Sequence, residues 1–168
     1  TWSNWNRRHL SQTGSGNTSN RFFQIGTNAN TNRIGTITNN GSGALVFTAA
    51  NFNVRQEGAN TATRTLALSG SNTGNNEIQG VIQSMNSTVG SLGVTKSGTG
   101  TWILSGNNTY TGATTITAGT LTIGGAGQLG SGSYSGAISN SGTFLYNGTN
   151  NQTLSGVISG NGVLTKNN

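Results

Sequence analysis

The sequence predicts an all-β fold in which short strands stack into a β-solenoid. Three observations carry this prediction. The chain of 168 residues is dominated by small and polar residues, with 28 Gly, 25 Asn, 27 Thr and 19 Ser. Its apolar residues alternate with polar ones over runs of about five residues, the pattern of a strand with one buried face. Similar runs recur along the chain, as in repeat proteins whose units bury their apolar faces by stacking.

Composition argues against helices and against disorder. Good helix formers are scarce, and no apolar run has helical spacing. Proline is absent, so turns must use Gly and Asn, which tolerate positive φ. Hydrophobic residues make up 30% of the chain and charged residues 6%. Low hydrophobicity favours disorder when charge is high, whereas here the charge is sparse and the apolar residues are patterned.

The chain divides into a leading segment, residues 1–35, and a repeat domain, residues 36–168. The leading segment holds the only His, His9, and several aromatic residues. We predict that it forms either a cap on the solenoid or a strand that docks on another subunit. Its candidate docking residues are Trp2, Trp5, Phe22 and Phe23.

Five segments of the repeat domain have the alternation of a strand with one inward face, and Gly, Asn and Ser separate them. They are Gly43–Phe47, Arg64–Leu68, Thr101–Ser105, Gly119–Ile123 and Gly142–Tyr146. We expect inward Leu, Ile and Val to stack between rungs, and ladders of Asn and Thr to line turns and outer faces. With about 20 to 25 residues per rung, the chain would make roughly six to eight rungs. A sandwich of short strands remains the alternative, because pairing direction is not readable from the pattern.

Internal similarity supports repetition. Three pairs of segments resemble each other: Leu66–Gly70 with Ile103–Gly106, Ile78–Ile82 with Leu154–Ile158, and Leu92–Lys96 with Gly162–Lys166. We expect each pair to occupy equivalent positions in successive units.

One stretch is more specific. Residues 94–121 read Val-Thr-Lys-Ser-Gly-Thr-Gly-Thr-Trp-Ile-Leu-Ser-Gly-Asn-Asn-Thr-Tyr-Thr-Gly-Ala-Thr-Thr-Ile-Thr-Ala-Gly-Thr-Leu. This stretch resembles the autotransporter-associated β-strand repeat, also called the passenger-associated transport repeat. The family pattern has Thr-Lys-x-Gly-x-Gly, then Asn-x-Tyr-x-Gly-x-Thr, then Gly-Thr-Leu, and Trp102 stands where Leu is usual. Residues 64–93 and 142–166 match more loosely, and residues 1–35 do not match.

The resemblance implies a right-handed parallel β-helix in a secreted or surface-displayed bacterial protein, with no catalysis by the repeat itself. We therefore expect the chain at the cell surface or outside the cell.

The absence of Cys excludes disulfides and thiolate metal sites. No stretch is long and apolar enough to span a membrane.

The sequence offers no catalytic, cofactor-binding or metal-binding site. Glu57 and Glu77 are the only acidic residues, and nothing suggests that they pair as glycosidase carboxylates do. The chain has no Asp, which disfavours calcium sites, and His9 alone cannot bind zinc. The prediction is therefore a protein that is not an enzyme and needs no cofactor.

The net charge of +6 reflects missing acids more than clustered bases. Such a surface can attract surface glycans or other polyanions. No dense Lys/Arg cluster of the kind that specific nucleic-acid binders carry is present.

The two ends suggest assembly. The final residues stop where, in the copy at Val94–Lys96, the next strand begins, so the last rung would be uncapped. We predict head-to-tail association of identical copies into an extracellular filament or matrix, with the aromatic leading segment meeting Val163, Leu164 and Lys166 of the next copy. The alternative is a fragment of an autotransporter-like passenger adhesin that binds glycans or cell surfaces.

Overall fold

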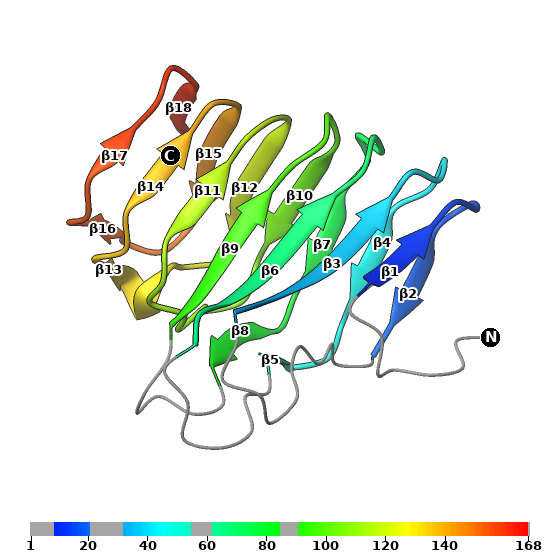
Figure 1. Ribbon diagram of the computed structural model, residues 1–168, viewed down its shortest axis with the longest axis horizontal. Coiled ribbons are helices and arrows are strands. Elements are labelled where there is room, and N and C mark those ends of the chain that lie inside the picture. Colours follow the sequence, from blue (N-terminus) through cyan, green and yellow to red (C-terminus); the bar gives the residue numbers. More distant parts are fainter. Residues whose placement is uncertain (1–8, 21–31, 55–61, 85–90, 168) are drawn as a thin grey trace.

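The structure is a computed structural model that describes residues 9–20, 32–54, 62–84 and 91–167. In these ranges the chain winds through successive rungs, each of which adds one strand to each of two long sheets (Figure 1). The only helical element there is a single 3₁₀ turn, η1 (Gly130–Gly132).

Each long sheet has seven strands, so the described chain makes seven rungs. The first sheet contains, in spatial order, β1 (His9–Gln12), β3 (Arg33–Asn39), β6 (Arg64–Ser69), β9 (Leu92–Lys96), β11 (Thr114–Ile116), β14 (Ile138–Asn140) and β17 (Ile158–Ser159). The second sheet contains β2 (Asn17–Ser19), β4 (Leu45–Phe47), β7 (Asn76–Ile78), β10 (Thr101–Leu104), β12 (Thr120–Gly125), β15 (Thr143–Gly148) and β18 (Val163–Lys166).

Two short sheets form the third side of the solenoid, at different positions along its axis. One pairs β5 (Asn51–Val54) with β8 (Val81–Ser84), and the other pairs β13 (Ser133–Tyr134) with β16 (Thr153–Leu154). The strand pairs of all four sheets are parallel. The predicted β-solenoid is therefore confirmed, and the structure is not a sandwich. The five strands predicted from alternation are present as β4, β6, β10, β12 and β15, with small shifts at their ends.

The core is a set of columns that run along the solenoid axis. Trp102, Leu121 and Phe144 are in register on β10, β12 and β15, and each is at most 1% exposed. Burying one such side chain is worth about 1.5–3 kcal/mol. Trp102 also donates a hydrogen bond from Nε1 to the carbonyl of Ser69, 3.1 Å away, which ties the second sheet to the first. The residue that departs from the family pattern is thus a core residue.

The internal similarities do not mark equivalent positions, so that expectation was wrong. Leu92–Lys96 forms β9 of the first sheet, whereas Val163–Lys166 forms β18 of the second. The other two pairs also fall on different sheets. The reason is physical: strands of either sheet need the same alternation and the same Gly-containing turns, so similar segments fit either wall.

The leading segment contributes to the solenoid. Its strand β1 pairs with β3, and β2 pairs with β4, so residues 9–19 form the first described rung. The boundary drawn at residue 35 lies within β3. The role of the segment as a cap or docking strand stays a prediction.

Glycine is required where rungs bend close together. Gly70 follows β6 with φ of +112°, and a Cβ there would collide with the backbone carbonyl of Asn39 in the preceding rung. An L-residue with a side chain is strained in this backbone region.

Gly70→Ala should therefore lower the free energy of unfolding by at least about 1–3 kcal/mol, the usual cost of such backbone strain. Urea denaturation followed by circular dichroism measures the change. The matched control is Gly14→Ala, where a Cβ would only approach the side-chain amide of Gln12, at 3.4 Å. Equal stability of the two variants would contradict this account of Gly70.

Candidate functional surfaces

The residues predicted to mediate assembly fall into two groups. Four lie outside the described residues: Trp2, Trp5, Phe22 and Phe23. Three lie together on β18 of the last rung: Val163, Leu164 and Lys166. Val163 pairs with Thr143, which faces outward, and so Val163 belongs to the side of the solenoid.

The open end of the solenoid is apolar. Leu164 is in register with the buried Phe144 and is 54% exposed, while Ile158 is in register with the buried Ile138 and is 39% exposed. Both side chains continue inward columns whose members in the preceding rung, Phe144 and Ile138, are buried. This end of the core therefore has the composition of an interior but is uncovered in the chain described.

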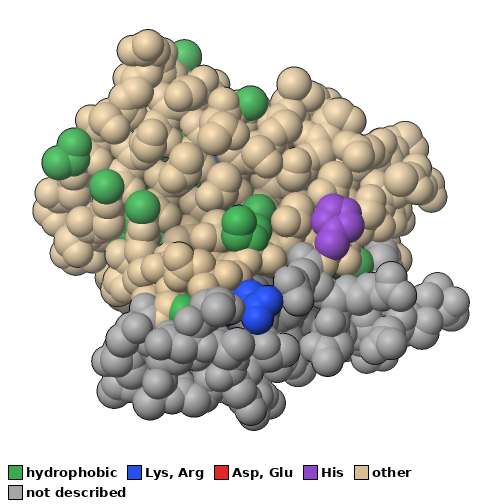
Figure 2. Space-filling view, in the orientation of Figure 1, with side chains coloured by type: hydrophobic (Ala, Val, Ile, Leu, Met, Phe, Trp, Pro, Cys, Tyr) green, Lys and Arg blue, Asp and Glu red, His purple; other side chains and the backbone are tan. Residues whose placement is uncertain are grey.

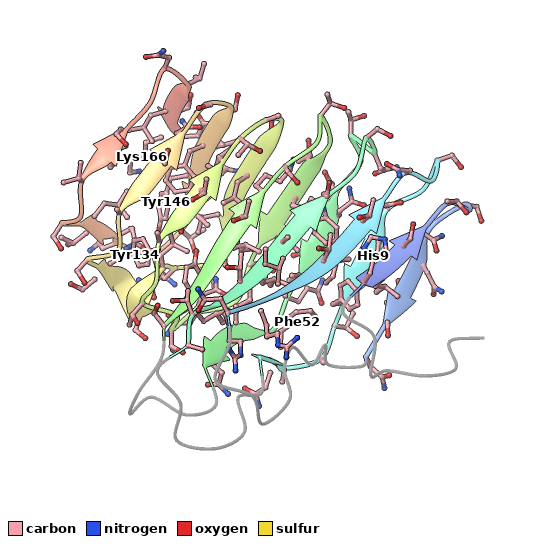
Figure 3. The ribbon with its side chains drawn as sticks, viewed as in Figure 1. His9, Phe52, Tyr134, Tyr146 and Lys166 are labelled. Atoms are coloured by element: carbon pink, nitrogen blue, oxygen red, sulfur yellow. The ribbon has the colours of Figure 1, made fainter. Side chains whose placement is uncertain are left out.

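Lys166 caps part of this end. It is in register with Tyr146, and its Nζ lies 5.8 Å from the centroid of the Tyr146 ring, within the range of a cation–π contact (Figure 3). The Tyr146 hydroxyl donates to the carbonyl of Asn150 at 2.7 Å. The long side chain of Lys166 thus covers the Tyr146 ring, the preceding member of its inward column.

The opposite end is different in character. The residues of β1 and β2 in register with the buried Ile37, Asn39, Leu45 and Phe47 continue the inward columns. They are Leu10, Gln12, Asn17 and Ser19. His9 is exposed on β1 (Figure 3). The first described rung is therefore polar at most inward positions, whereas the last is apolar.

Asparagines link rungs from inside the solenoid. The Asn76 side chain accepts from the amide of Leu45 at 3.0 Å and donates to the carbonyl of Thr101 at 2.8 Å, so it joins three successive strands of the second sheet. Asn39 donates to the Asn76 side-chain oxygen from the end of β3 in the first sheet. Buried amides with their polar groups paired bind both walls together.

Asparagine side chains also form hydrogen bonds within a recurrent Asn-x-Gly turn. The Asn39 side-chain oxygen accepts from the amide of Gly41 at 2.9 Å, and that of Asn140 accepts from Gly142 at 3.1 Å. Asn140 also donates to the carbonyl of Val163 in the next rung, at 2.8 Å. Asn was expected to line turns and outer faces; Asn39 and Asn140 do line turns, but their side chains are buried inside the solenoid. The sequence indicated this burial, because Asn39 and Asn140 each occupy an inward position in the strand alternation and stand two residues before Gly.

The Tyr and Thr of the motif Asn108-Thr-Tyr-Thr-Gly-Ala-Thr114 belong to the core. The hydroxyl groups of Tyr110 and Tyr134 each lie 2.9 Å from Thr114 Oγ1, and the two rings meet edge to face with centroids 5.6 Å apart. Burial raises the pKa of Tyr110 well above its usual value. These motif residues are therefore structural and present no group for binding.

Lys96 is an interior lysine. It is fully buried, and its Nζ donates to the carbonyls of Ser97, Gly98 and Ala118 at 2.7, 2.8 and 3.1 Å. All three ammonium protons are thus used, and the contact with Ala118 joins β9 to the next rung. Burial lowers the pKa of Lys96 to about 8.

No catalytic arrangement is formed by the described acidic or imidazole groups. The Glu77 carboxylate accepts from Ser105 Oγ at 2.5 Å and from Gln79 Nε2 at 3.1 Å. Glu57 lies outside the described residues. Within the described ranges no three His, Asp or Glu side chains gather as they would around a metal ion, and no helix is both long and apolar enough to cross a membrane.

The fold and its internal ladders define a parallel β-solenoid repeat protein. Residues 94–123 match the model of the passenger-associated-transport-repeat family, so the chain carries a repeat of the family that its sequence resembles. The matched residues run from β9 through β12 and include Lys96, Trp102, Tyr110 and Thr114.

The chain is similar to the adhesin BmaC autotransporter of Brucella suis biovar 1 (strain 1330). The identity is 38% over 101 residues, which cover 60% of this chain and 3% of that relative. The chain thus spans a small part of the relative's length. No solved structure matches it significantly.

The interior lysine predicts a stability that rises with pH. The folded protein releases the Lys96 proton near pH 8, whereas the unfolded chain holds it until about pH 10.5. Between these values the unfolded chain binds more protons, so the free energy of unfolding should increase with pH, by at most about 1.4 kcal/mol per unit.

Urea titrations at pH 8 and 9 measure this rise, because an unfolded tyrosine with a pKa of about 10 is still mostly protonated there. Lys96→Met should remove it, and Lys166→Met, at an exposed position, should keep it. A wild-type stability that is flat or falling over this interval would refute the role given to Lys96.

Proposed function

We propose that this chain is a segment of the solenoid stalk of a surface-displayed autotransporter adhesin. The observation that carries the proposal is the family repeat at residues 94–123, which lies within an unbroken ladder of seven parallel rungs. Each rung is hydrogen-bonded to the next, so the element is stiff along its axis and suits a spacer that holds a binding region away from the cell. The similarity to an adhesin autotransporter supports the same role.

The proposed role is mechanical and involves no catalysis. Within the described residues, the groups that could do chemistry are used structurally: the Lys96 amine is enclosed by carbonyls, the Tyr110 hydroxyl is buried, and Glu77 is held by Ser105. A stalk of this kind would be extracellular, which agrees with a chain that has no Cys to form disulfides or be oxidised.

Contact with surface glycans or other polyanions is part of the proposal, on the basis of the net charge of +6. Of the cations in the described ranges, Lys96 and Arg64 are buried, while Lys166 is exposed and Arg33 half-buried. The described solenoid would therefore contribute Lys166 and Arg33 to such a contact.

Antibodies raised against the purified chain should label intact cells of the source bacterium. Proteinase K applied to intact cells should abolish the signal, and a periplasmic marker protein should survive the treatment as the control. Labelling that appears only after permeabilisation would contradict surface display.

A second candidate is a filament of identical copies stacked head to tail. Leu164 and Ile158, which are exposed on the last described rung, would supply an apolar contact between copies. The polar inward positions of β1 and β2 are a poor match to this end, and so the stalk has the stronger support.

If copies do associate through this end, Leu164→Lys should convert larger species to monomers in sedimentation velocity experiments, because it places a charge in the contact. Leu145→Lys is the matched control, since Leu145 is half-buried on the side of β15. A wild-type chain that stays monomeric at all concentrations would eliminate the filament and leave the stalk unaffected.

A further inference from the structure

The outward side of the first sheet carries an ordered array of hydroxyl groups. In β3, β9 and β11 the sequences Thr36-Ile-Thr38, Thr95-Lys-Ser97 and Thr115-Ile-Thr117 place two hydroxyls outward and one side chain inward. The strands are parallel and in register, so these hydroxyls form two straight ranks perpendicular to the strands. We name the side of the first sheet that bears them the hydroxyl face.

Both ranks extend over most of the sheet. The first rank begins with His9 and continues through Thr36, Ala67, Thr95, Thr115, Ser139 and Ser159, so one Ala interrupts its hydroxyls. The second rank contains Thr38, Ser69, Ser97, Thr117 and Ser141. Neighbours in a rank are about 4.8 Å apart, and the ranks are about 6.7 Å apart, because these are the strand spacing and the two-residue repeat along a strand.

A third rank on the same face is mainly apolar. It contains Ile34, Thr65, Gly93, Ala113, Ala137 and Val157. Ile34 is 58% exposed, and Val157, which lies in the last rung, is 73% exposed. This side of the sheet thus combines methyl groups with hydroxyls.

Among the residues that the structure describes, the hydroxyl face lacks charged side chains over most of its area. Figure 2 looks onto this side and shows an uncharged surface crossed by hydrophobic groups, with His9 near one end and Lys or Arg colour only at the lower border. Lys96, the described cation of β9, points inward. The second sheet is less regular, since Thr101, Thr120 and Thr143 form one outward rank but Val46, Glu77 and Ile103 follow one another in the rank beside it.

A charge-free, regular face restricts the ligand that it can bind. One hydroxyl gains little by exchanging bulk water for another partner, so affinity requires many contacts formed at once. A flexible neutral chain would lose conformational entropy on ordering, which leaves a rigid lattice as the better partner. The lattice must be flat, uncharged and rich in hydroxyls, and its repeats must resemble the two spacings of the face.

We propose that the hydroxyl face binds the surface of ice crystals. Water oxygens in hexagonal ice repeat along two perpendicular axes at intervals close to the rank and strand spacings. The Thr and Ser hydroxyls of both ranks can donate and accept, and β-branching restricts χ1 at the Thr positions, so part of each rank is pre-organised to hold water in a lattice. Crystalline polysaccharide is the weaker fit, because sugar rings stack on aromatic side chains and the buried Trp102, Tyr110 and Tyr134 are unavailable. The inference does not depend on the stalk role.

The test is ice-affinity partition of the purified chain, with thermal hysteresis measured by nanolitre osmometry. The wild-type chain should enrich in a slowly growing ice hemisphere, whereas serum albumin is excluded. Thr115→Lys should lose most of this enrichment, because a hydrated charge in the middle of the first rank breaks the lattice contact. Ser139→Lys, one strand further at an exposed position of the same rank, should act in the same way.

The matched control is Thr143→Lys, which adds the same charge to the outward side of β15 in the second sheet and should leave the enrichment intact. Circular dichroism verifies that each variant is folded. Exclusion of the wild-type chain from ice, or equal losses in the three variants, would overturn the proposal. Sedimentation with microcrystalline cellulose without enrichment in ice would also overturn it and would assign the face to a polysaccharide.

Discussion

The in-register parallel ladder is the constraint on which the rest of the structure depends. Each rung satisfies its backbone groups by bonding to the rungs before and after it, as when the amide of Thr117 donates to Lys96 and that of Ser141 donates to Ile116. Register then fixes which side chains form columns. An inward column can hold aliphatic residues, aromatic rings or amides, but a shift of one residue would turn every inward side chain outward.

This constraint explains how a chain with 30% hydrophobic residues folds. Stacking lets a small apolar content form continuous columns, and the polar residues inside, Asn39, Asn76 and Lys96, spend their polar groups on rung-to-rung hydrogen bonds. Such groups are costly when buried alone, and pairing offsets much of that cost. The same register that builds the core also orders the outer surface, so the hydroxyl ranks follow from the ladder.

Much of the fold could be predicted from sequence because alternation and Gly-containing turns are local signals. Strands such as β10 and β12 were found in this way, and the motif at residues 94–121 identified the repeat. The wall to which a strand belongs could not be predicted, since Leu92–Lys96 and Val163–Lys166 have similar sequences and lie on different sheets. The burial of Asn39 and Lys96 could not be predicted from residue type either, because polar residues are normally expected on the surface.

The surfaces were predicted less completely. Leu164 and Lys166, predicted as assembly residues, are exposed on the last described rung, and their role in assembly stays a prediction. The hydroxyl face could not be predicted, because single Thr and Ser residues carry no signal until the register of seven strands aligns them.

Distances between spin labels test the ladder most directly. The chain has no Cys, so pairs of introduced cysteines can be labelled specifically. Thr36→Cys combined in turn with Thr115→Cys, Ser139→Cys and Ser159→Cys should give separations that rise by about 4.8 Å per strand, to about 24 Å for the last pair. A series that does not increase in this order would contradict the parallel, in-register solenoid.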